Sequence, residues 1–79
     1  MDRTSQEEIK AHLMQTNEHY RDLHSRHREY KRLVEGLEAK LALTPEEEVE
    51  EHRLKKLKLH VKDEMEKMVS EYHLQHATS

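Results

Sequence analysis

The stretch LALTPEEE, residues 41–48, contains the strongest structural break in this sequence. Thr44 can cap a helix that begins at Pro45, where the missing proline N–H does no harm, and Glu47 stands three residues after the cap. The run of glutamates at 46–48 also lies where the helix dipole favours negative charge. The stretch predicts a helix start at residue 45, directly after a short turn at 42–44.

Upstream of this turn, apolar residues recur in alternating steps of four and three. The pattern runs from Ile9 to Leu41 and passes through Thr16 and His27. Such steps are typical of the face of a coiled-coil helix. Gly36 falls off this face and should weaken the helix by about 1 kcal/mol without ending it. The pattern predicts one helix over about residues 5–41.

Downstream, a second apolar face predicts a helix over about 45–74, followed by a frayed tail at 75–79. A short turn between two amphipathic helices makes them antiparallel neighbours. The fold class is therefore predicted as all-α, a single domain over 1–79 built as an antiparallel two-helix hairpin of coiled-coil type. The residues expected in its seam are Tyr20, Leu23, His27, Tyr30, Val34, Leu37, Leu54, Leu57, Val61, Met65 and Met68.

The hairpin is expected to self-associate. Ile9 and Leu13 should extend past the second helix, and Leu33, Leu59 and Val69 add apolar surface on the outer flanks. A chain of 79 residues has difficulty burying enough surface alone. A homodimer that forms a helical bundle is the simplest remedy.

The composition excludes several classes of protein. With 33% hydrophobic and 39% charged residues, one Gly, one Pro and no Phe or Trp, the chain suits long solvated helices. The absence of cysteine excludes disulfide scaffolds and thiolate zinc sites and fits a cytoplasmic protein. The longest purely apolar run, 41–43, is too short to span a bilayer, so no membrane association is expected.

Positive charge is concentrated in two segments, 19–32 and 52–62, which together we call the basic waist. They hold ten Lys/Arg against two acids, whereas the rest of the chain is strongly acidic. Such a patch can bind nucleic-acid phosphates, or it can pair with the acidic ends of neighbouring molecules. No aromatic platform for bases accompanies it, because Tyr20 and Tyr30 belong to the seam. The candidate partner-binding residues are Arg26, Arg28, Lys55, Lys56, Lys58 and Lys62.

The eight histidines raise the possibility of a metal site. His24 and His27 are three residues apart, as are His73 and His76, so each pair shares a helix face. A zinc site needs three or four converging ligands, and no such set is evident. There is also no phosphate-binding glycine loop or nucleophile elbow, and a two-helix hairpin offers no concave pocket. We expect no metal, no cofactor, no small-molecule substrate and no enzymatic activity.

Two stretches resemble a known family. HYRDLHSRHREY (19–30) and LKKLKLHVKDEM (54–65) are similar to the small bacterial YdcH-like proteins, a domain of unknown function. The resemblance implies a helical hairpin and brings no catalytic residue. Val61 replaces the commoner Leu, and Tyr30 stands where an aliphatic residue is more usual. The residues that carry the match most closely are Leu54, Lys55, Lys56, Lys58, Leu59, Lys62, Asp63 and Glu64.

These observations together predict a non-enzymatic helical protein that acts through protein contacts, as an adaptor or structural module. Its expected partner is a second copy of itself, with another protein as a further candidate. The alternative is a nucleic-acid-binding regulator that uses the basic waist.

Overall fold

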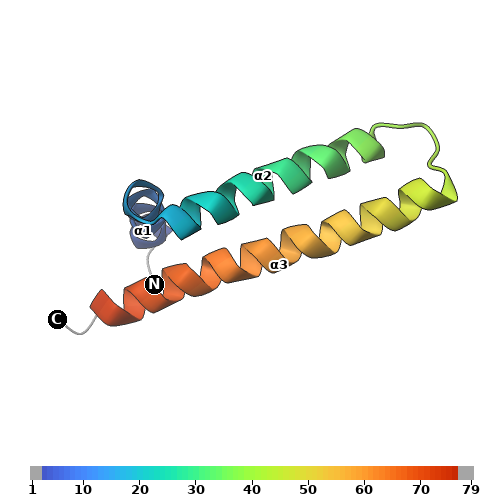
Figure 1. The fold of residues 1–79 in the computed structure, drawn as a ribbon. Helices are drawn as coiled ribbons and strands as arrows, with labels where there is room; N and C mark the ends of the chain where they lie inside the picture. Colours follow the sequence, from blue (N-terminus) through green and yellow to red (C-terminus); the bar gives the residue numbers. More distant parts are fainter. Residues whose placement is uncertain (1–2, 77–79) are drawn as a thin grey trace.

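The computed structural model describes residues 3–76, with side chains from residue 6 onward. This part of the chain forms three helices: α1 at Arg3–Thr16, α2 at Glu18–Glu38 and α3 at Pro45–His76 (Figure 1). The predicted all-α class is confirmed. The predicted two-helix hairpin is not confirmed, because the helix expected over 5–41 is divided into α1 and α2. Of the expected frayed tail, Gln75 and His76 are helical, and 77–79 lie outside the described residues.

Helices α2 and α3 lie side by side and run in opposite directions along the long axis of a molecule that measures 54 × 22 × 17 Å (Figure 1). They pack because each has an apolar stripe at helical spacing. Leu23 and Val34 of α2 are buried, as are Leu54 and Val61 of α3. The core of the pair is therefore a single line of side chains.

The turn between α2 and α3 is longer than expected. Helix α2 ends at Glu38, and the Ala39 and Lys40 N–H groups bond back to the carbonyls of Glu35 and Leu37 at 3.0 and 3.1 Å. The chain leaves the helix three residues before the expected end at 41. Leu41 is consequently fully exposed and takes no part in the seam.

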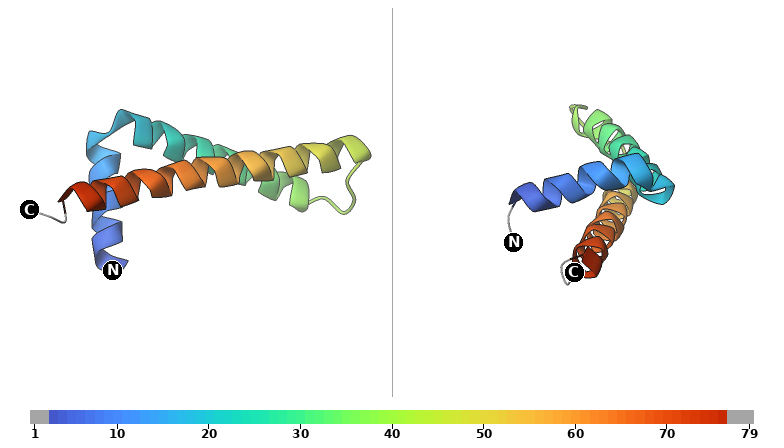
Figure 2. Two further views of the ribbon diagram at one scale, coloured as in Figure 1. Left: turned by 90° about the horizontal axis from the view of Figure 1, so that it is seen from below. Right: turned by 90° about the vertical axis from the view of Figure 1, so that its left-hand side faces the viewer.

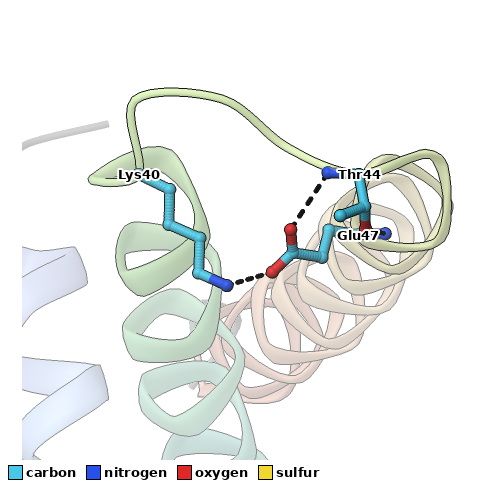
Figure 3. Close-up of polar contacts among 3 residues, drawn as sticks. All are labelled: Lys40, Thr44 and Glu47. Atoms are coloured by element: carbon cyan, nitrogen blue, oxygen red, sulfur yellow. Dashed lines mark hydrogen bonds and ion pairs between the residues drawn. The ribbon is translucent and has the colours of Figure 1, made fainter.

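The start of α3 follows the capping-box prediction. The Glu47 N–H donates to Thr44 Oγ1 at 3.1 Å, and the Thr44 N–H donates to Glu47 Oε1 at 3.0 Å (Figure 3). Lys40 forms an ion pair with the same glutamate across the turn. The hydrogen bond from Lys40, followed by those from Thr44, lowers the pKa of the Glu47 carboxyl. One side chain therefore caps α3 and ties it to the end of α2.

Asn17 separates α1 from α2. Its backbone is extended, at φ −119° and ψ 109°, and its side-chain oxygen accepts the Tyr20 N–H at 2.9 Å. This is the geometry of a helix N-cap, and asparagine is among the best residues for it. Helix α1 therefore turns away from the line of α2 and crosses one end of the α2–α3 pair (Figure 2).

The crossing buries residues that were expected to be free. Ile9 and Leu13 of α1 form a cluster with Tyr20 and with Val69 of α3, flanked by Met14, Met65, Met68 and Tyr72. The expectation that Ile9 and Leu13 extend past α3 is wrong, because α1 folds back across it. Val69, assigned to an outer flank, is buried for the same reason.

Candidate interaction surface

The two segments of the basic waist lie on adjacent helices. Segment 19–32 belongs to α2 and segment 52–62 to α3, and the two helices are antiparallel neighbours (Figure 1). Their cations are therefore brought onto one stretch of the molecule, as the charge pattern predicts.

Four of the cations in the waist are held by carboxylates. Arg26 Nε lies 3.2 Å from Asp22 Oδ2, and Lys55 Nζ lies 3.1 Å from Glu38 Oε2. The Lys55–Glu38 pair joins α3 to α2, and the bond to Glu38 raises the pKa of Lys55. Arg32 and Arg53 are held within their own helices by Glu29 and Glu50, at 2.8 and 2.7 Å.

The other cations of the waist make no ion pair within residues 6–76. They include Arg28, Lys56, Lys58 and Lys62, four of the six candidate partner-binding residues, together with Arg21 and Lys31. The structure therefore divides the candidate set: Arg26 and Lys55 are ion-paired within the described residues, and the remaining four are not.

The expected seam residues differ in how deeply they are buried. The fully buried ones are Tyr20, Leu23, Val34, Leu54 and Val61, whereas His27, Tyr30, Leu37, Leu57, Met65 and Met68 are half-buried. Sequence reasoning missed Ile9, Leu13 and Val69 as core residues. Asn17 was the signal in the sequence that could have revealed these three core residues. A good N-cap residue followed by an acid marks a helix start, and a new helix at this point allows α1 to fold back across α3.

His27 is the histidine of the seam. Burial lowers its pKa, and the positive charges of Lys58, His24, Lys31 and Lys62 lower it further. Lys58 and Lys62 lie on either side of the buried Val61 in the sequence, so His27 faces this part of α3. His27 is therefore neutral at pH 7, because burial and the cations on both α2 and α3 disfavour its protonated form.

The other histidines make ring and acid contacts. The His12 and Tyr72 rings are 5.2 Å apart, the Tyr72 and His76 rings stack at 4.0 Å, and His60 Nε2 lies 3.5 Å from Glu64 Oε1. Within the described residues, no three His, Asp or Glu side chains gather as metal ligands would. These contacts were not anticipated from the sequence.

A family model described as "Protein of unknown function (DUF465)" matches residues 21–69 of this chain. The chain belongs to this family. No curated protein and no solved structure gives a match. The DUF465 match begins within α2 and ends at Val69 in α3, so it covers the antiparallel pair and most of the basic waist. Helix α1 lies entirely outside it.

Within residues 3–76, no helix is long and apolar enough to span a bilayer.

Proposed function

We propose that this DUF465 protein works by binding other proteins, first of all a second copy of itself, and that it performs no catalysis. The observation that supports this best is its exposed apolar surface. Among residues 6–76, eight buried hydrophobic residues form the core, while five large hydrophobic residues remain 42% to 107% exposed: Leu33, Leu41, Val49, Leu59 and Leu74. A core this thin is a poor basis for a stable lone chain, and association is the usual compensation.

The proposed contact runs through the outer face of α3, where Leu59 is 57% exposed. Leu59 lies between Lys58 and His60, and the unpaired cations Lys56 and Lys62 are close to it in the sequence. A partner face with an apolar centre and acidic surroundings would suit it. The ends of this same chain are acidic, so an offset second copy would supply such surroundings.

Sedimentation over a wide concentration range tests self-association. The expected mass rises above the 9.6 kDa of one chain as the concentration increases. Leu59→Glu should move this rise to higher concentration. Ser70→Glu adds the same charge at an exposed polar site of α3 and should not change the concentration at which the mass rises. A strictly monomeric and cooperatively melting protein at every concentration would overturn the proposal.

Nucleic-acid binding is the second candidate, and the cations of the waist that make no ion pair favour it. Binding would rest on phosphate neutralisation and would weaken steeply with salt. The double change Lys56→Glu and Lys62→Glu should abolish a shift of a mixed oligonucleotide pool at low salt. Lys10→Glu with Lys67→Glu makes the same charge change outside the waist and should retain it. No shift by the native protein would end this candidate.

The resemblance of residues 19–30 and 54–65 to the YdcH-like proteins belongs with this proposal. If the resemblance reflects common descent, those proteins should share the antiparallel pair and its exposed lysines. The shared part would then be the α2–α3 surface, and α1 would be an addition of this chain.

A further inference from the structure

A pocket of about 320 Å³ lies where α1 crosses the α2–α3 pair, and residues of all three helices line it. We call it the corner pocket. Met14 of α1, Tyr20 of α2, and Met65 and Val69 of α3 form its buried and half-buried floor. Lys10 and Lys62 stand on its exposed side. The pocket exists because α1 folds back at Asn17, and a simple two-helix hairpin would not contain it.

The charges at the rim are unequal. Lys10 and Lys62 make no ion pair within residues 6–76, and Glu66 is the carboxylate that lines the pocket. Neutral His27 and the neighbouring His24 complete the polar side. Two ammonium groups against one carboxylate favour an anionic group beside an apolar floor.

Tyr20 adds a hydrogen-bond donor. Its side chain is almost fully buried, yet its hydroxyl bonds to no other described residue. No buried side-chain N or O atom in the described part of the chain lacks a partner, so this hydroxyl keeps a small contact with solvent, and Tyr20 lines the pocket. Burial raises the pKa of Tyr20, so the hydroxyl keeps its proton at neutral pH. It can donate to a ligand oxygen.

We propose that the corner pocket binds a small amphipathic carboxylate, namely a free fatty acid of medium chain length. The alkyl chain lies against Met14, Met65 and Val69, and the carboxylate faces Lys10 and Lys62. A volume of 320 Å³ holds roughly ten heavy atoms at the ~30 Å³ that a water molecule occupies in the liquid. Methionine side chains are flexible and adapt to such a chain.

Titration of the isotope-labelled full chain with sodium decanoate, below its micelle concentration, tests this site by NMR. Saturable shifts are expected at Ala11, Met14 and Val69, with little change near the turn at 39–44. 1-Decanol and decyltrimethylammonium should bind about tenfold more weakly or worse, since they lose a charge-assisted contact. Equal binding of all three probes, or no saturable shift with decanoate, would overturn the proposal.

Variants separate the site from general charge attraction. Lys62→Gln should weaken decanoate binding about tenfold, and Lys67→Gln, an exposed lysine of the same helix that does not line the pocket, should leave it unchanged. Ala11→Met fills the pocket from exposed α1 and should abolish binding, with unchanged helix content by circular dichroism. Equal losses in the two lysine variants, or full binding by folded Ala11→Met, would refute the site.

Self-association is followed in the same samples. Pocket shifts that grow with protein concentration in the absence of decanoate would mean that a second copy fills the pocket, which also overturns the proposal. Binding of decanoate by a strictly monomeric protein would instead support the pocket while the proposed protein-contact function fails.

Discussion

At the scale of single residues, His27 couples the α2–α3 contact to pH. Its pKa is lowered by burial and by Lys58, His24, Lys31 and Lys62, so the unfolded chain binds a proton more readily than the folded one. The contribution of neutral His27 to the free energy of unfolding is fully present above the ordinary histidine pKa of 6.5 and is lost as the pH falls below that value. Acid should therefore loosen the helix pair at this point.

We predict that His27→Gln reduces the loss of stability in mild acid. Urea unfolding at about pH 7.5 and about pH 5.5 brackets the titration of an ordinary histidine and measures the difference. His52→Gln, at an exposed site of α3, is the control and should behave like the native chain. An equal acid effect in both variants would contradict this role of His27.

Leu54 and Leu59 belong to the same helix and differ in exposure, at 4% and 57%. Leu54→Ala should cost about 2–4 kcal/mol because it removes a buried leucine from a thin core. Leu59→Ala should cost less than about 0.5 kcal/mol at concentrations where the chain is alone. Thermal or urea unfolding of the dilute protein measures both. Equal costs would mean that the Leu59 face is also buried.

At the scale of helices, the start of α3 was predictable and the break at Asn17 was missed. At 44–47, a threonine, a proline and a glutamate all indicate the same helix start, and the structure has both capping bonds. At Asn17 the apolar spacing continues unbroken from Leu13 to Tyr20. Periodicity records which face of a helix is apolar but not whether the chain changes direction, so the break at Asn17 was missed.

The Asn17 cap is expected to stabilise the protein measurably. Asn17→Ala removes the acceptor of the Tyr20 N–H and should lower the free energy of unfolding by about 1 kcal/mol. Asn17→Asp keeps an acceptor and should be nearly neutral, and Gln15→Ala, at an exposed site of α1, is a second control. Urea unfolding of the three variants provides the comparison. If Asn17→Ala leaves the free energy of unfolding unchanged, the packing of α1 alone determines the break between α1 and α2.

Gly36 offers a stabilising change in α2. An added Cβ meets no atom within 4 Å, and the residue lies inside the helix. Gly36→Ala should raise the free energy of unfolding by about 0.5–1 kcal/mol, since alanine loses less backbone freedom on folding. The melting temperature of dilute protein is the measurement. A loss of stability there would show that the space beside Gly36 is occupied in solution, for example by a partner.

At the scale of the whole molecule, the α2–α3 pairing and the basic waist could be predicted from the sequence, whereas the corner pocket could not. Two separately spaced apolar faces joined by a short turn are enough to predict an antiparallel pair. The pairing of Lys55 with Glu38, and the lack of an ion pair at Lys56 and Lys62 within residues 6–76, depend on side-chain positions that spacing alone does not specify. The corner pocket was missed because it depends on the direction of α1.

The charge of the whole chain leads to the last prediction. The formal charge is −3 with all eight histidines neutral, and full protonation would reverse its sign. The imidazole side chain in general gains its proton near pH ~6.5, so the net charge should pass through zero in mildly acidic solution. Repulsion between molecules is then weakest, while the basic waist and the acidic ends still attract each other. Solubility measured against pH should have its minimum there, and added salt should raise that minimum by screening the attraction. A minimum deepened by salt would point instead to association through exposed apolar residues such as Leu59.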